Sequence, residues 1–93
     1  MAEAELFGLK DAHVIITGAS GGIGLAITDF FLNKLESRVS AHANQKPEAL
    51  EKLEWHTSNI ITLKANATNE EEVERFYRET IRRFGPPEVL VGT

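Results

Sequence analysis

The sequence TGASGGIG, residues 17–24, decides the fold of this chain. An apolar run, residues 13–16, precedes it, and residues 25–32 after it carry apolar side chains at helical spacing. Four glycines stand within seven residues, although each costs a regular element about 0.5–1 kcal/mol relative to alanine. Such a turn between a strand and a helix lets backbone N–H groups and the positive end of the helix dipole face an anion. The stretch therefore predicts a phosphate-binding turn, and the flanking strand and helix disfavour an ordinary surface loop.

Strand and helix patterns alternate on both sides of this turn. Strands are expected at residues 13–17, 38–42 and 59–65 and from residue 89 onward. Helices are expected at residues 23–35 and 47–53 and between a cap at residue 68 or 69 and a stop at residue 85, with a loop at residues 55–58. The first strand is apolar without alternation, as in parallel strands that are buried on both faces.

The predicted order β-α-β-α-β-α-β indicates an α/β fold, one half of a Rossmann-type doubly wound parallel sheet, in a single domain of residues 1–93. Short connections and right-handed crossovers give an expected strand order of 3-2-1-4. The first two helices then cover one face of the sheet, and the third covers the other. The glycine turn lies at the carboxyl end of the first strand, beside the reversal of strand order, where such sheets bind ligands.

The third helix has the strongest signals. Its expected first turn, residues 70–72, is acidic and its last, residues 82–83, is basic, as the helix dipole favours. An apolar face is expected from Val73, Phe76, Tyr77, Thr80, Ile81 and Phe84. Tyr77 is therefore interpreted as a core residue. Because the sequence contains no neighbouring helix, we expect an apolar patch around Phe76 and Ile81.

Composition indicates a globular chain, with 42% hydrophobic and 26% charged residues. The net charge of −4 offers no basic surface to nucleic acid or to an acidic membrane. No apolar run approaches the ~18–20 residues that span a bilayer, and the acidic N-terminus lacks the pattern of a signal peptide. The chain has no cysteine, and its histidines lack metal-ligand spacing. We therefore expect a cytoplasmic protein without a metal site.

Several nucleotide-binding glycine patterns compete for the turn. The P-loop pattern G-x-x-x-x-G-K-[ST] fails because no glycine and lysine follow at the required offsets. The dinucleotide pattern G-x-G-x-x-G fails because no three glycines have that spacing. In contrast, T-G-x-x-x-G-x-G fits residues 17–24, and G-x-x-G-x-x-G fits residues 18–24. The turn alone leaves these two patterns open.

At this point the sequence resembles the short-chain dehydrogenase/reductase family, from about Leu9 to Thr93. The T-G-x-x-x-G-x-G turn is typical of the main branch of that family. Residues 65–68, Ala-Asn-Ala-Thr, stand where the family usually has Ala-Asp-Val-Thr, and residues 84–91 resemble its F-G-x-x-D-V-L-V segment. The resemblance implies an oxidoreductase that uses a nicotinamide dinucleotide to transfer hydride to or from a carbonyl or alcohol substrate.

The resemblance also implies roles for individual residues. Gly18 permits the tight turn, Ser20 donates its hydroxyl near a cofactor phosphate or ribose, and Ile23 offers its backbone N–H to the diphosphate. Asn66 takes the place of an aspartate that usually contacts adenine, and its alternative role is to cap the end of the preceding strand. The implied cofactor-binding residues are Gly18, Ser20, Gly21, Gly22, Ile23, Gly24, Asn44, Lys46, Asn66 and Ala67.

The end of the second strand bears on the choice between NAD and NADP. Sites of this kind place an acidic residue about twenty residues past the turn when they select NAD. Residues 43–46, Ala-Asn-Gln-Lys, contain no acid. Because a carboxylate would repel the 2′-phosphate of NADP, its absence favours NADP, and Asn44 and Lys46 offer further contacts. NADP is therefore the predicted cofactor, with NAD second and a merely solvated Lys46 as the alternative interpretation of that residue.

The resemblance does not extend to catalytic residues. The family uses a serine, a Tyr-x-x-x-Lys pair and usually an asparagine, whereas Tyr77 is followed four residues later by Ile81. No catalytic residue is assigned, and we expect the cofactor-binding half of an enzyme, a fragment that is inactive alone. The alternative is a non-catalytic nucleotide-binding or interaction module from a truncated gene product. The open edge of its fourth strand would pair with a partner or with a second copy in a homo-oligomer.

Overall fold

Four parallel strands form the sheet of the computed structural model, which describes residues 8–19, 21–45 and 48–92. The strands are β1 (His13–Thr17), β2 (Arg38–Ala43), β3 (Ile60–Lys64) and β4 (Val89–Gly92). Their order, β3-β2-β1-β4, is the predicted one. Two predicted site residues, Ser20 and Lys46, lie outside the described residues.

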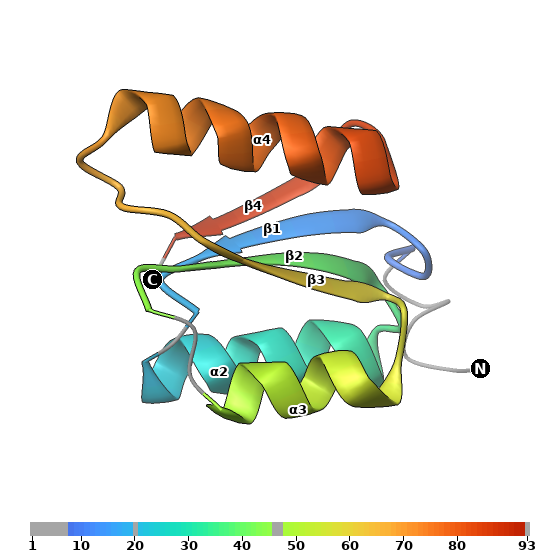
Figure 1. Ribbon diagram of the computed structural model, residues 1–93. Helices are drawn as coiled ribbons and strands as arrows, with labels where there is room; N and C mark the ends of the chain where they lie inside the picture. The colour runs from blue at the N-terminus through green and yellow to red at the C-terminus, as the bar shows by residue number, and fades with distance from the viewer. Residues whose placement is uncertain (1–7, 20, 46–47, 93) are drawn as a thin grey trace.

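Helices cover both faces of the sheet (Figure 1). On one face lie α2 (Gly22–Asp29), its continuation η1 (Phe30–Lys34) and α3 (Glu48–His56), and on the other lies α4 (Glu70–Phe84). This arrangement confirms the predicted doubly wound α/β fold. The strand boundaries agree with the ranges expected from the sequence to within one residue.

The side chains of β1 alternate between two hydrophobic layers. Val14 and Ile16 are fully buried in the layer that includes Leu50 of α3. Ile15 is fully buried in the opposite layer, against Phe76 of α4. The unbroken apolar run therefore has a physical cause, which is that both faces of this parallel strand are covered.

α4 begins and ends where the sequence predicts. At its start the Asn69 side chain accepts a hydrogen bond from the Glu72 N–H (3.2 Å), a cap worth about 1 kcal/mol. Gly85 ends it with a positive φ of +79°, which favours glycine. The predicted apolar patch is wrong in part, because Ile81 is 45% exposed but Phe76 is buried. Phe76 packs onto the sheet itself, so it does not depend on a neighbouring helix.

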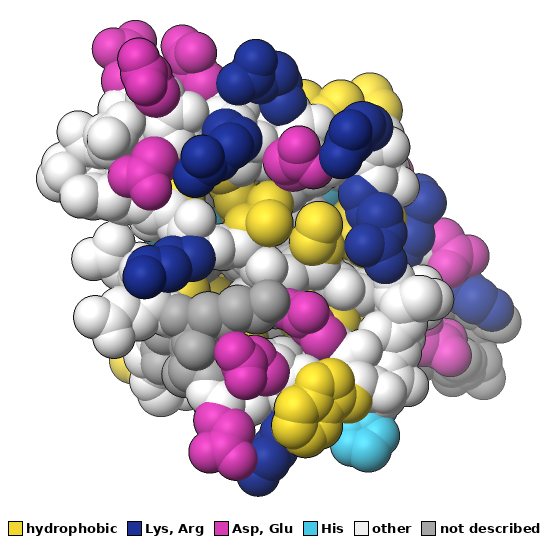
Figure 2. Space-filling model, viewed as in Figure 1, with side chains coloured by type: hydrophobic (Ala, Val, Ile, Leu, Met, Phe, Trp, Pro, Cys, Tyr) yellow, Lys and Arg dark blue, Asp and Glu magenta, His cyan; other side chains and the backbone are white. Residues whose placement is uncertain are grey.

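Mixed charges cover the outer face of α4, at the top of Figure 2. Ion pairs join Arg75 to Glu72 (3.8 Å) and Arg82 to Glu79 (2.7 Å). Exposed pairs of this kind contribute about 0–1 kcal/mol each, so they mainly keep this face solvated. Within the described ranges, no helix has both the length and the apolar character that crossing a bilayer requires.

The first helix differs from its expected form. The sequence predicts one α-helix over residues 23–35, but the hydrogen bonding becomes π-helical from Phe30, and the Leu35 N–H donates to the Phe30 carbonyl (3.2 Å). Leu32 and Leu35 are both buried. Leu32 and Leu35 are three residues apart, a spacing that also fits one face of an α-helix, so the apolar pattern carries no signal for the change.

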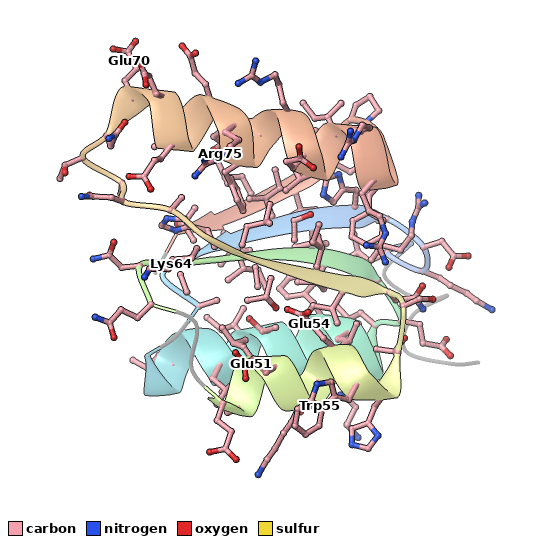
Figure 3. All side chains as sticks on the ribbon, in the orientation of Figure 1. Glu51, Glu54, Trp55, Lys64, Glu70 and Arg75 are labelled. Carbon is pink, nitrogen blue, oxygen red and sulfur yellow. The ribbon has the colours of Figure 1, made fainter. Side chains whose placement is uncertain are left out.

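α3 extends further than the sequence indicates. The predicted loop at residues 55–58 is wrong in part, because Trp55 and His56 belong to the last turn of α3. Trp55 is 72% exposed and projects away from the sheet (Figure 3). The prediction ended this helix at Leu53, the last leucine with core spacing, and a solvent-exposed turn has no apolar pattern to extend it. The expected first residue, Pro47, lies outside the described residues.

Candidate functional site

The turn between β1 and α2 begins at Gly18, whose φ is +67°. Residues with a Cβ rarely adopt this left-handed conformation. The Gly18 N–H donates to Nδ1 of His42 (3.4 Å), and the N–H of Ala19 donates to the His42 carbonyl (2.9 Å). The backbone therefore leaves β1, turns against the end of β2 and enters α2, and the positive φ of this path favours a glycine at position 18.

Gly24 is required for a different reason, which is close packing. A Cβ added to this buried residue would overlap the Gly18 carbonyl oxygen and lie 2.8 Å from Cα of Ala19. These are backbone atoms, which cannot swing aside as the end of a flexible side chain can. α2 therefore rests directly on the turn, with no side chain between them.

The packing of the protein does not require glycine at positions 21 and 22. Both are exposed, and a Cβ added at either would meet nothing within 4 Å among the described residues. The φ of Gly21 is −73°, a value that any residue adopts. The two glycines instead leave the N-terminus of α2 open to an approaching group.

The N-terminus of α2 has the properties of an anion-binding site. An α-helix leaves its first N–H groups without carbonyl partners of its own, and Gly21 at the cap has no side chain to bind them. No acidic residue in the first turn offsets the positive end of the dipole. Ile23 is 75% exposed, so solvent reaches this first turn. A phosphate oxygen is the kind of acceptor that such a helix start binds.

Among the hollows that adjoin the turn, two meet at the step from Thr17 to Gly18. The turn hollow, about 430 Å³, is lined by the four turn glycines with Ile23, Ile27 and Gly92. The α4 hollow, about 260 Å³, is lined by Thr17, His42, Ala67, Val73, Phe76 and Tyr77. Thr17 lines one hollow and the next residue, Gly18, lines the other. An extended ligand that crosses the turn would therefore reach both spaces.

The remaining predicted site residues lie close to the α4 hollow or past the strand ends. Ala67 lines this hollow, whereas Asn44 and Asn66 are exposed and line neither hollow. The Oδ1 of Asn66 accepts from the N–H (2.9 Å) and the hydroxyl (2.7 Å) of Thr68. These bonds support the capping interpretation of Asn66 and leave its amide NH₂ to face a ligand. The structure thus brings the turn glycines together and leaves both asparagines at the periphery.

His42 lies at the turn, although the sequence did not mark it as a site residue. It is half-buried near the carboxyl end of β2 and bonds both to the turn and to the Ala65 carbonyl after β3. Its signal in the sequence is a large polar side chain between Ala41 and Ala43 near the end of a buried strand. Tyr77, predicted as core, is half-buried, since its ring packs edge-on against Phe76 (5.4 Å) but also lines the α4 hollow.

A second histidine, His13, lies at the amino end of β1, away from the turn, and is inaccessible to water. Its Nδ1 is 2.8 Å from the Gly85 carbonyl, and its Nε2 is 2.7 Å from Oγ of Ser40. Because a carbonyl only accepts, Nδ1 donates to Gly85, and Nε2 of the neutral ring accepts from the Ser40 hydroxyl. Burial lowers the pKa of His13 below its ordinary 6.5, and the charge of Arg38 acts in the same direction. This ring joins β1, β2 and the end of α4.

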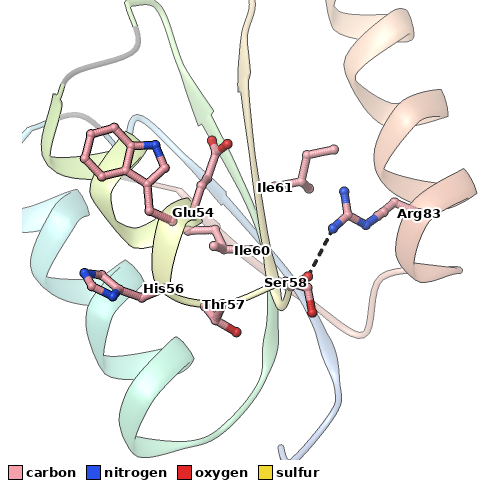
Figure 4. A pocket seen from close by; sticks show the side chains of 8 residues that line it. Glu54, His56, Thr57, Ser58, Ile60, Ile61 and Arg83 are labelled. Atoms are coloured by element: carbon pink, nitrogen blue, oxygen red, sulfur yellow. Dashed lines mark hydrogen bonds between the residues drawn. The ribbon is translucent and has the colours of Figure 1, made fainter.

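A separate hollow of about 440 Å³ lies at the opposite end of β3 from the turn (Figure 4). Arg83 lines it, and its guanidinium donates to the Ser58 carbonyl (3.1 Å). Ser58 precedes β3, whereas the glycine turn faces the segment that follows it. This hollow therefore has no part in the site at the turn. Across the described residues, no three His, Asp or Glu side chains are grouped to hold a metal ion.

The sequence of this chain is similar to those of a known protein family. The sequence model of the short chain dehydrogenase family matches residues 12–93. An uncharacterized oxidoreductase of Bacillus subtilis is 35% identical over 79 residues, a match that covers 83% of this chain and 22% of that protein. A short chain dehydrogenase/reductase of Colletotrichum higginsianum is 29% identical over 93 residues, covering 98% of this chain and 35% of that protein. The chain therefore spans only about a fifth to a third of the length of these relatives.

A solved structure with a similar fold is the 3-ketoacyl-(acyl-carrier-protein) reductase from Brucella melitensis, which was crystallised in complex with NADH. The TM-score is 0.78 at 22% identity, over 88% of this chain and 34% of that one. At this identity the likeness concerns the fold alone. The shared part is a Rossmann-type fold, and this chain spans about a third of the length of the reductase.

Proposed function

This chain belongs to the short chain dehydrogenase family, and on that premise we propose that it is the nicotinamide-dinucleotide-binding part of an oxidoreductase. The complete enzyme would transfer hydride between the cofactor and a small carbonyl or alcohol substrate. The observation that carries the proposal is the open N-terminus of α2 beside Gly21 and Gly22, with a hollow on each side of the turn. Residues 1–93 are assigned to one cofactor-binding domain.

The residues at the turn fit a dinucleotide. We assign the diphosphate to the backbone N–H groups of Gly22 and Ile23. Gly22 has no side chain, and Ile23 is exposed to solvent, so the helix start is open to the ligand. The adenosine end is assigned to the side of the α4 hollow, next to Asn66 and Ala67. The nicotinamide end is then left to the turn hollow. When bound, the nicotinamide supplies or accepts the hydride, and the residues of this chain hold and orient it.

We further propose that the cofactor is NADP rather than NAD. Asn44 is exposed directly after β2, and residues 43–46 contain no acid. A carboxylate at this place would bind the ribose hydroxyl of NAD and repel the 2′-phosphate of NADP. Lys46 adds a positive charge within two residues of Asn44. A charge-assisted hydrogen bond of about 1.5–3 kcal/mol corresponds to about one to two decades of affinity.

The first test compares the two reduced cofactors. We expect the dissociation constant of NADPH to be about ten- to a hundredfold lower than that of NADH, measured by titration of cofactor fluorescence. Asn44→Asp should weaken NADPH binding about tenfold and spare NADH. Asn59→Asp makes the same charge change at an exposed residue before β3 and serves as the control. Equal or tighter NADH binding would contradict the NADP preference, and binding of neither would contradict the dinucleotide site.

A second prediction concerns turnover. Residues 1–93 contain no Tyr-x-x-x-Lys pair, and the one tyrosine, Tyr77, is half-buried against Phe76. We therefore expect the chain to bind NADPH without oxidising it when a panel of carbonyl substrates is added. The measurement is the loss of NADPH absorbance with time, with a complete family member as the positive control. Turnover above the rate without protein would refute this expectation.

A non-catalytic nucleotide-binding or interaction module is the second candidate. The observation in its favour is β4, an edge strand of the sheet whose Leu90 is 62% exposed. Such an edge can pair with a further strand. The reading frame beyond residue 93 distinguishes the two proposals. A Tyr-x-x-x-Lys pair downstream would favour the enzyme, whereas a stop codon together with a folded product would favour the module.

A further inference from the structure

His42 holds two consecutive peptide groups of the glycine turn. Its ring nitrogen Nδ1 accepts from the Gly18 N–H (3.4 Å), and its backbone carbonyl accepts from the Ala19 N–H (2.9 Å). His42 is 24 residues away from Gly18 in the sequence. The start of the turn is therefore anchored to β2 by one residue, through both its side chain and its main chain.

The second ring nitrogen defines the state of this anchor. Nε2 of His42 lies 2.8 Å from the Ala65 carbonyl oxygen. A carbonyl only accepts, so Nε2 carries the hydrogen, and Nδ1 is free to accept from Gly18 only in the neutral ring. One imidazole therefore bridges the carboxyl ends of β1 and β3. Ala65 directly precedes Asn66 and Ala67, so the bridge also joins the turn to the segment assigned to the adenosine end.

The ring is also packed in place. It meets the Phe76 ring edge-on, with centroids 5.4 Å apart and an interplanar angle of 71°. His42 forms part of the wall of the α4 hollow together with Thr17 and Ala67. An apolar side chain of similar size would keep this packing but would leave the Gly18 N–H and the Ala65 carbonyl without the ring as a partner. The two hydrogen bonds are thus separable from the packing by substitution.

We propose that His42 is a positioning residue of the nucleotide site, where its neutral ring holds the glycine turn ready for the diphosphate. Glycine has more backbone freedom than any other residue, so a glycine-rich turn loses much entropy when it closes on a ligand. A bond that restrains Gly18 in the free protein reduces that loss on binding, which raises affinity. The inference rests on the proposed dinucleotide function and adds to it a residue that contacts the turn rather than the reacting atoms.

Three substitutions of His42 separate its contacts. Asn places an amide oxygen near the position of Nδ1, so it can still accept from Gly18. Gln reaches instead toward the position of Nε2, so it can still donate to Ala65, and Phe keeps only the ring packing. We expect NADPH affinity to fall about fivefold or more in His42→Gln and His42→Phe, and to stay within about threefold of wild type in His42→Asn. His56→Gln, at an exposed position of α3, is the control.

The readouts distinguish positioning from a general loss of stability. The Gly18 amide should exchange its hydrogen faster in the Gln and Phe variants, with the Asn variant close to wild type, and nitrogen NMR should find the ring hydrogen on Nε2. If wild type binds NADPH and the Gln and Phe variants bind it equally well, the role of His42 is refuted but the proposed function is not. A ring hydrogen on Nδ1 refutes it as well. If wild type binds neither dinucleotide, the proposed function fails, and this inference fails with it.

Discussion

Gly24→Ala is expected to lower NADPH affinity by at least about tenfold and the free energy of unfolding by about 1–3 kcal/mol. The added methyl group would overlap the Gly18 carbonyl oxygen and lie 2.8 Å from Cα of Ala19. Only a shift of α2 away from the turn relieves this overlap. That shift moves the helix start to which we assign the diphosphate. Urea unfolding and titration of cofactor fluorescence measure the two effects on the same preparation.

Gly21→Ala is the matched control, because it adds the same methyl group where nothing lies within 4 Å among the described residues. Its free energy of unfolding should stay within about 0.5 kcal/mol of wild type. NADPH binding should still weaken, because the methyl group stands at the approach to the helix start. Equal stability of the two variants would contradict the close packing at Gly24. Unchanged binding in both would contradict the assignment of the diphosphate to this turn.

His13→Phe is expected to lower the free energy of unfolding by about 2–4 kcal/mol at neutral pH. The phenyl ring keeps the packing against Phe84, whose ring centroid lies 5.3 Å from that of His13. It removes the bonds to the Gly85 carbonyl and to the Ser40 hydroxyl, and a buried group without its partner costs about 1–3 kcal/mol. The affinity of the folded variant for NADPH should change little, because His13 lies at the end of β1 away from the turn.

The same residue predicts a dependence of stability on pH. Burial lowers the pKa of His13 below 6.5, Arg38 acts in the same direction, and the Gly85 bond and Glu88 oppose them. The unfolded chain therefore takes up a proton near pH 6.5 that the folded chain does not. The free energy of unfolding therefore keeps its full value above pH 6.5. It decreases as the pH falls toward the lowered pKa, by up to about 1.4 kcal/mol per pH unit.

Urea unfolding at about pH 7.5 and about pH 5.5 measures this dependence. Wild type should be less stable at the lower pH, and His13→Phe should lose most of that difference. His56→Gln removes an exposed histidine at the end of α3 and should retain the difference. A pH dependence that is equal in wild type and in His13→Phe would show that the ring titrates alike in the folded and unfolded chain.

Local signals in the sequence account for most of the fold. The unbroken apolar run of β1, the cap at Asn69 and the stop at Gly85 each act within one element, and each is where the sequence places it. The errors occur where no local signal exists. The exposed last turn of α3 has no apolar pattern, and the π-helical segment that begins at Phe30 buries the same leucines as an α-helix would.

The candidate site likewise has features that the sequence predicts and features that it does not. The glycine pattern locates the turn, and its role in cofactor binding stays a prediction. The pattern does not say which glycine serves which purpose. Gly18 has a positive φ and Gly24 has no room for a Cβ, whereas Gly21 and Gly22 are open. These differences depend on where α2 packs against the turn, which no spacing within the motif encodes.

By itself, then, the sequence determined the order of strands and helices, the strand order of the sheet and the position of the glycine turn. The elements and the turn follow from hydrophobic periodicity, caps and glycines, all of which act over a few residues, and the strand order follows from short connections and right-handed crossovers. Only the tertiary structure decided that His42 anchors the turn and that His13 closes the other end of β1. Their partners lie 24 and 72 residues away in the sequence. Contacts of that range exist only once the strands have paired and the helices have packed onto them.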